Sequence, residues 1–130
     1  MRSVKSLNLF VIDDMATSRG LITQALDEIG LTMYRTESDP KVALSAIVQN
    51  PVHIVLSDFN MPGMSGLQLL EHLRRNQSTQ NIGFILITGK PSQQIVTEAK
   101  RLRLNNLIKK PFTTASMKTC IEAVTGPLGP

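Results

Sequence analysis

The chain has 130 residues, of which 42% are hydrophobic, and a net charge of +4. This length and composition predict one globular domain that buries about two thirds of its unfolded surface, which argues against a second domain. No apolar stretch approaches the roughly 20 residues of a membrane span, and the first residues lack the apolar core of a signal peptide, so we expect a cytoplasmic protein.

Short apolar runs alternate with helical patterns in the first half of the chain. The run over residues 9–12 precedes a helix over about 16–29, which Gly30 is placed to end. A short strand over 32–36 follows, and Asp39 before Pro40 then predicts the capped start of a second helix.

The same alternation continues in the second half. A strand over 53–57 leads into a turn-rich loop and a helix, and the run over 83–88 is nearly all apolar, which predicts a central strand buried on both faces. Ser92 can cap a fourth helix, a fifth strand over 107–109 ends before Pro111, and a last helix begins near Thr113. Five strands alternating with five helices predict an α/β domain with a parallel sheet over residues 1–125 and a flexible tail over 126–130.

Reactive side chains follow four of the five predicted strands. They are Asp13 and Asp14, Asp58, Thr88, and Lys110. Because parallel strands present their carboxyl ends at one edge, where ligands bind in open α/β sheets, we expect these side chains to meet there.

Three carboxylates at one edge repel each other unless a positive charge lies among them. Oxygen ligands suit Mg²⁺ bound beside a phosphoryl group, and Lys110 and Thr88 offer an ammonium and a hydroxyl for phosphate oxygens. Asp58 stands alone at a central strand end and is the best candidate nucleophile for an aspartyl phosphate, whereas the adjacent Asp13 and Asp14 suit metal binding.

The sequence resembles a response regulator receiver domain over about residues 7–124, most closely in the stand-alone chemotaxis form of the CheY type. The motifs that carry the resemblance are the run from Phe10 to Asp14 with Arg19 five residues later, the run from Leu56 to Gly66, Ile87-Thr88-Gly89, and Lys109-Lys110-Pro111-Phe112.

The resemblance implies a doubly wound, flavodoxin-like and CheY-like sheet of order 2-1-3-4-5. It implies Asp58 as the phosphoacceptor, Mg²⁺ as the cofactor, and Asp13, Asp14, Asp58 and the backbone carbonyl of Asn60 as metal ligands. It further implies that Lys110 contacts the phosphoryl group and that Thr88 moves to bond it.

The implied partners are a sensor histidine kinase of the CheA type as phosphoryl donor and, on the output side, the flagellar motor switch or a phosphatase. Such a regulator is a signalling phosphoacceptor that catalyses only its own phosphorylation and dephosphorylation, and we expect it to be a monomer. Because the chain ends after the fifth helix, we expect output through partner binding. A basic stretch after residue 89 could steer an acidic protein partner, and it lacks the signatures of nucleic-acid binding.

Two residues depart from the family pattern. Leu107 stands three positions before Lys110, where the family usually has an aromatic residue coupled to the threonine movement. Lys90 lies two residues after Thr88, where we expect it to alter the lifetime of the aspartyl phosphate. Because of both residues, an alternative function is considered: a phosphate sink, which takes phosphoryl groups from a kinase shared with another regulator.

Two other classes remain as alternatives. A Mg²⁺-dependent phosphohydrolase of the haloacid dehalogenase kind would need two aspartates separated by one residue after the first strand, whereas Asp13 and Asp14 are adjacent. A flavodoxin-like carrier of FMN would need a hydroxyl- and glycine-rich loop there, and the loop is acidic. The lone Cys120, at helical spacing with apolar neighbours, is expected to be a core residue and permits no internal disulfide.

Overall fold

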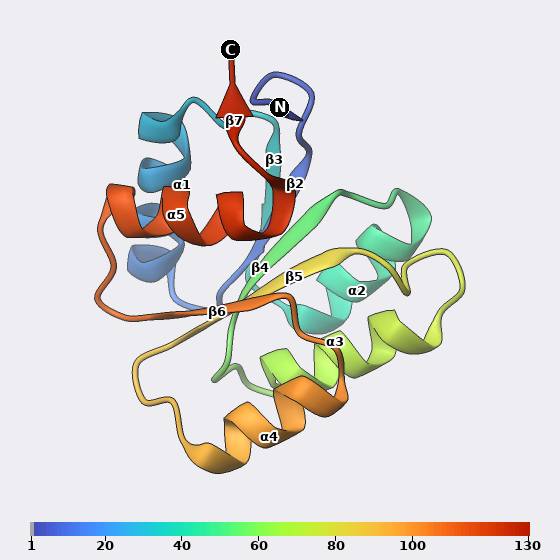
Figure 1. The fold of residues 1–130 in the computed structure, drawn as a ribbon. Helices are drawn as coiled ribbons and strands as arrows, with labels where there is room; N and C mark the ends of the chain where they lie inside the picture. The colour runs from blue at the N-terminus through green and yellow to red at the C-terminus, as the bar shows by residue number, and fades with distance from the viewer. Residues whose placement is uncertain (1) are drawn as a thin grey trace.

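The structure is a computed structural model that describes residues 2–130, and its centre is a five-stranded parallel sheet (Figure 1). The strand order is β3-β2-β4-β5-β6. Counted along the chain among these five strands, this is the predicted order 2-1-3-4-5, which is confirmed. The strands are β2 (Leu9–Ile12), β3 (Tyr34–Glu37), β4 (Ile54–Asp58), β5 (Gly83–Thr88) and β6 (Asn106–Lys109).

Helices cover both faces of the sheet, as Figure 1 shows. On one face lie α1 (Ala16–Ile29) and α5 (Thr114–Thr125), which pack against each other. On the other lie α2 (Pro40–Gln49), α3 (Gly66–Arg75) and α4 (Gln93–Arg101). Each face therefore has its own hydrophobic core, and the sheet separates the two.

The central strand β5 contributes alternate side chains to the two cores. Phe84 and Leu86 pack in the core under α2, α3 and α4, whereas Ile85 and Ile87 pack in the core under α1 and α5. Successive side chains of a strand point to opposite faces, so a strand covered on both sides needs an unbroken apolar run. The predicted central strand is thus confirmed.

Capping residues set most helix starts where the sequence predicts them. The Asp39 side chain accepts from the Lys41 N–H, and the Ser92 side chain accepts from the Ile95 N–H. Gly30 ends α1 with a φ of 98°, a left-handed conformation that favours glycine. These residues define where α1 ends and where α2 and α4 begin.

Two short segments differ from the predictions. The second strand lies at Tyr34–Glu37 and not at 32–36, and its side chains are only partly buried at the sheet edge. Leu128–Gly129 form a short strand, β7, paired with β1 (Arg2–Ser3), within the segment predicted to be a flexible tail. The strand forms because Leu128–Gly129 pair with Arg2–Ser3 at the other end of the chain, and the local sequence over 126–130 gives no sign of this pairing.

Arg74 joins three segments at the amino ends of β5 and β6. Its guanidinium donates to the carbonyls of Gln80, Ile82, Leu102 and Arg103 and to the Asn105 side chain, at 2.7 to 3.2 Å. Burial, followed by the charge of nearby Arg103, lowers its pKa. This network lies at the end of the sheet opposite to the predicted site, whose residues are at the carboxyl ends of the strands.

Within residues 2–130, the structure contains no helix both long and apolar enough to cross a membrane.

Candidate functional site

The predicted site residues converge at the carboxyl edge of the sheet. Asp13 directly follows β2, Asp58 and Thr88 are the last residues of β4 and β5, and Lys110 directly follows β6. Asp13, Asp58 and Thr88 are buried, although aspartate and threonine side chains are mostly exposed in folded proteins. The parallel topology therefore assembles the site from separate parts of the chain.

The acidic part of the site consists of Asp13, Asp14 and Asp58. One carboxylate oxygen from each lies within 4.8 Å of the others. Asp13 Oδ1 accepts a hydrogen bond from the Met15 N–H at 3.0 Å, which fixes the carboxylate plane. Its second oxygen, Oδ2, is buried and has no hydrogen-bond partner in the described part of the chain.

Lys110 supplies the positive charge within this cluster. Its Nζ donates to Asp58 Oδ1 at 2.9 Å and to Ser18 Oγ at 3.0 Å. Asp13 Oδ2 lies 3.6 Å from the same nitrogen, which is an ion-pair distance but too long for a hydrogen bond. A single ammonium thus faces three carboxylates, and the cluster retains excess negative charge.

The environment shifts the pKa of both partners in the central ion pair. Burial, with the neighbouring charges of Asp13 and Asp14, raises the pKa of the Asp58 carboxyl, although its bond to Lys110 acts in the opposite direction. Burial disfavours the charged form of Lys110, but its bond to Asp58 and the carboxylate charges outweigh this effect and raise its pKa. The charged Asp58 is therefore held in an environment that favours a further cation.

The donor set fits a hard divalent cation such as Mg²⁺. Mg²⁺ prefers oxygen ligands and is usually held by one or two carboxylates, with several waters retained. Asp13 Oδ2 is a buried anionic oxygen without a hydrogen-bond donor, an arrangement that is costly unless a cation satisfies it. Asp14, at least partly exposed, leaves an open side for water and for a phosphoryl group.

Gly66 fixes the loop that follows Asp58. The Gly66 N–H donates to the Phe59 carbonyl at 2.9 Å, and a Cβ at Gly66 would lie 2.5 Å from the Asp58 carbonyl oxygen. Only glycine permits the start of α3 to approach the end of β4 this closely. The backbone of Asp58 is thus in close contact with the start of α3.

The hydroxyl of Thr88 lies at the same edge but does not join the cluster by a hydrogen bond. Its Oγ1 accepts from the Lys90 N–H at 3.3 Å, and the Thr88 carbonyl accepts from the Lys110 N–H at 2.9 Å.

The other predicted site residues lie around this cluster. Lys90 is exposed, and Leu107 is partly buried against the core under α2, α3 and α4. Asn60 is exposed in the loop two residues after Asp58.

The remaining sequence interpretations concern residues outside the site. Cys120 is buried in the core under α1 and α5, as predicted, and burial raises the pKa of its thiol to about 11. β4 begins one residue later than predicted, so His53 lies just before it, and the His53 Nδ1 accepts from the Asn8 N–H. Sequence reasoning missed Ser18, because one serine in a helical pattern gives no sign that it contacts a lysine 92 residues away.

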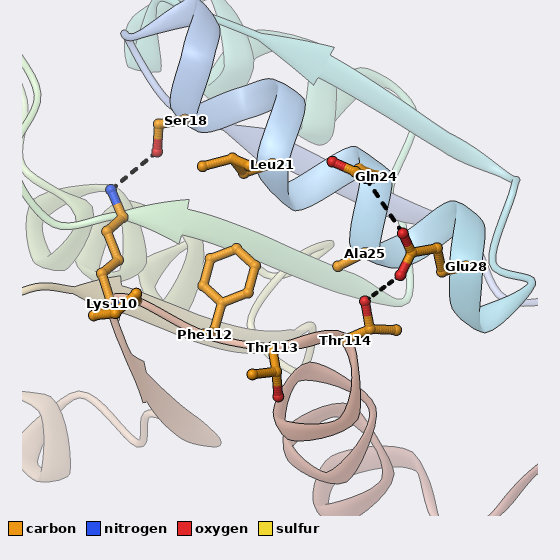
Figure 2. A pocket seen from close by; sticks show the side chains of 10 residues that line it. Ser18, Leu21, Gln24, Ala25, Glu28, Lys110, Phe112, Thr113 and Thr114 are labelled. Atoms are coloured by element: carbon orange, nitrogen blue, oxygen red, sulfur yellow. Dashed lines mark hydrogen bonds between the residues drawn. The ribbon is translucent and has the colours of Figure 1, made fainter.

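A groove of about 570 Å³ opens beside Lys110, between α1 and the segment leading into α5 (Figure 2). Figure 2 shows the Phe112 ring between Lys110 and Thr114 along this groove. Across the groove, Thr114 donates a hydrogen bond to Glu28, which joins α5 to α1. Ser18 and Lys110 both line the groove, so it is continuous with the acidic site.

Comparison with known proteins identifies the family. Residues 9–122 match the model of the response regulator receiver domain. The chain belongs to this family. It is 36% identical to a probable chemotaxis protein CheY of Rhizobium etli, over 98% of the chain and 99% of that relative, and 28% identical to chemotaxis protein CheY-3 of Vibrio cholerae, over 92% of each. Membership decides against the haloacid dehalogenase and flavodoxin alternatives.

Solved structures show the same fold. Vibrio cholerae CheY4, a chemotaxis protein, superposes with a TM-score of 0.84 at 21% identity, covering 91% of this chain and 98% of that one. The receiver domain of a Pseudomonas aeruginosa sensor histidine kinase, described with a magnesium ion coordinated in its active site cleft, gives a TM-score of 0.80 at 18% identity, covering 93% and 98%. The chain is thus a response regulator receiver domain, a signalling module with CheY-like relatives.

Proposed function

We propose that this receiver domain is a Mg²⁺-dependent phosphoacceptor of a two-component phosphorelay, with Asp58 as the residue that is phosphorylated. The observation that best supports this proposal is the buried Oδ2 of Asp13, which accepts no hydrogen bond from the described residues and lies beside the Asp58–Lys110 ion pair. Asp13, Asp14, Asp58 and the Asn60 carbonyl are the proposed metal ligands. Bound there, Mg²⁺ would neutralise carboxylate charge and polarise the phosphoryl oxygens.

The proposed reaction has Asp58 as the nucleophile. A carboxylate oxygen of Asp58 attacks the phosphorus of a donor phosphohistidine, the P–N bond breaks, and the imidazole leaves with the bonding electron pair. Lys110 lies 2.9 Å from Asp58 and holds positive charge where the phosphoryl oxygens arrive, and the Thr88 hydroxyl can donate to one of them. In the separate dephosphorylation step, water attacks the phosphorus, the acyl phosphate P–O bond breaks, the Asp58 carboxylate is regenerated with the bonding electron pair, and inorganic phosphate leaves.

The proposed donor is a sensor histidine kinase, of the CheA type if the chain shares the pathway named for its chemotaxis relatives. The proposed output is phosphorylation-dependent binding to the flagellar motor switch or to a phosphatase, by a monomeric protein in the cytoplasm. Adding a dianionic group to a buried site can shift a two-state loop and helix face toward a binding form.

Phosphoryl uptake tests the proposal directly. The wild-type protein, incubated with acetyl phosphate and Mg²⁺, is expected to gain one phosphoryl group in intact-mass spectrometry. Asp58→Asn is expected to gain none, because the amide cannot act as the nucleophile. Asp39→Asn is the matched control, since Asp39 caps α2 and asparagine preserves the cap.

Equal uptake by Asp58→Asn and the wild type would contradict the proposal. Uptake by the wild type in the presence of a chelator would contradict the magnesium requirement.

The phosphate-sink function is a second candidate, and Leu107 favours it. The side chain packs against the core under α3 and α4 and provides no aromatic ring to couple Thr88 to an output surface. Binding of a motor switch peptide to the phosphorylated and unphosphorylated protein separates the two functions. A sink is expected to show no affinity gain on phosphorylation, and a motor regulator a clear one.

Lys90 is a proposed modulator of the phosphoryl lifetime. Its backbone N–H contacts Thr88 Oγ1, so its exposed side chain begins close to the hydroxyl that would bond the phosphoryl group. Lys90→Ala is expected to change the decay rate of phosphorylated Asp58 by about threefold or more, because it removes a cation near the path of the attacking water. Lys100→Ala, on α4, is the control, and equal decay rates in all three proteins would contradict this role.

A further inference from the structure

Ser18 accepts a hydrogen bond from the Lys110 ammonium at the edge of the site. The hydroxyl comes from the first turn of α1 and is half-buried, and Figure 2 shows it facing the lysine across the end of the groove. Lys110 Nζ lies 3.0 Å from Ser18 Oγ and 2.9 Å from Asp58 Oδ1. The ammonium is therefore held between a neutral oxygen on the helix and one carboxylate.

The third neighbour of the ammonium is Asp13 Oδ2, at ion-pair distance but not at hydrogen-bond distance. Asp13 Oδ2 lies 3.6 Å from Nζ and accepts no hydrogen bond, although Asp13 is fully buried. A lysine ammonium has three donors, and its bonds to Asp58 and Ser18 use two of them. A small displacement of Nζ toward Asp13 Oδ2 would bring the two atoms within hydrogen-bond distance.

Such a displacement would alter the metal site. A carboxylate oxygen that accepts a short, charge-assisted bond from lysine is a poorer ligand, and the ammonium itself would repel a divalent cation more strongly at shorter range. The observed position keeps the lysine on Asp58 and leaves Asp13 Oδ2 available.

We propose that Ser18 is a positioning residue that holds Lys110 away from Asp13 and so reserves one Asp13 oxygen for the divalent cation. This inference rests on the proposed function, because it takes the three carboxylates as a Mg²⁺ site. Ser18 acts through Lys110 and touches neither the cation nor the phosphoryl group.

The test measures Mg²⁺ affinity by calorimetry, without any phosphoryl donor. Ser18→Ala is expected to weaken Mg²⁺ binding by about fivefold, because the released ammonium pairs with Asp13 Oδ2. Ser18→Thr keeps a hydroxyl oxygen and is expected to bind like the wild type. Thr17→Ala is the matched control, since it removes an exposed hydroxyl from the adjacent position, which faces a different direction on the helix.

A double-mutant cycle distinguishes positioning through Lys110 from a general effect on the fold. Lys110→Ala is expected to tighten Mg²⁺ binding, and adding Ser18→Ala to that variant is expected to change the affinity by less than about 1.5-fold. Equal affinities of wild type and Ser18→Ala, or an undiminished Ser18 effect without Lys110, would overturn the inference and leave the proposed function standing. Failure of the wild type to bind Mg²⁺ would overturn both.

Discussion

At the scale of single residues, the ionised carboxylate of Asp58 stabilises the fold less than its protonated form does in the absence of metal. Burial and the nearby aspartates raise its pKa, so the folded state binds a proton at this group more readily than the unfolded chain does. The resulting stabilisation is complete below the ordinary aspartate pKa and is lost as the pH rises through the higher folded value. At neutral pH the charged side chain therefore contributes less to stability than the protonated side chain would.

This sign predicts the effect of Asp58→Asn on stability. In Mg²⁺-free buffer at neutral pH, the variant is expected to unfold at a higher denaturant concentration than the wild type, because asparagine is neutral and can still accept from Lys110. The measurement is urea unfolding with and without saturating Mg²⁺, which is expected to stabilise the wild type by binding the native state alone. A variant less stable than the wild type without Mg²⁺ would contradict this account.

The residue types of the site were predictable, whereas their contacts were not. Asp13, Asp14, Asp58 and Lys110 follow strand ends, and the structure brings these four together. The bond from Lys110 to Ser18 depends on how α1 lies over the end of β6, which is a tertiary arrangement and leaves no periodic signal in the sequence.

At the scale of elements, the joint between β4 and α3 is the most tightly constrained. A Cβ at Gly66 would lie 2.5 Å from the Asp58 carbonyl oxygen and 2.7 Å from Leu86 Cδ1, so either the helix or the end of the strand would have to move. Gly66→Ala is expected to destabilise the protein by about 1 to 3 kcal/mol, the usual range for overpacking, and to slow phosphorylation by shifting Asp58.

Gly20→Ala is the control in the same urea unfolding measurement. Gly20 lies within α1, where a Cβ would meet nothing within 4 Å, so alanine is expected to stabilise the protein by roughly 0.5 to 1 kcal/mol through helix propensity. If Gly66→Ala were as stable as the wild type, the close approach at this joint would not be a constraint.

The positions of buried or capped elements were predicted well, whereas those of the edge strand β3 and the terminal strand β7 were not. The apolar run of β5 and the capped starts of α2 and α4 have local signals that agree with the structure. The edge strand β3 has partly buried, mixed side chains, so its position shifted relative to the predicted one. The pairing of β7 with β1 joins the two ends of the described chain, which no local pattern can indicate.

At the scale of the whole molecule, the sheet order brings distant residues to one edge. Alternating strands and helices predicted a parallel sheet, but the order 2-1-3-4-5 came from resemblance to the receiver family, because hydrophobic periodicity alone does not select among strand orders. The winding places β2 and β4 side by side, so Asp13 and Asp58 become neighbours although 45 residues separate them in the sequence. The acidic cluster is therefore assembled by the order of the strands.

We propose that one Mg²⁺ binds among Asp13, Asp14 and Asp58 while Asp58 carries the phosphoryl group. A crystal structure of the protein with Mg²⁺ and beryllofluoride, which mimics an acyl phosphate, would show both groups at once. We predict one ion about 2.1 Å from oxygens of Asp13, Asp14, Asp58 and the Asn60 carbonyl, with beryllium bonded to Asp58 and its fluorides contacting Lys110 and Thr88. Beryllofluoride on another residue, or an ion that contacts none of these aspartates, would contradict the account.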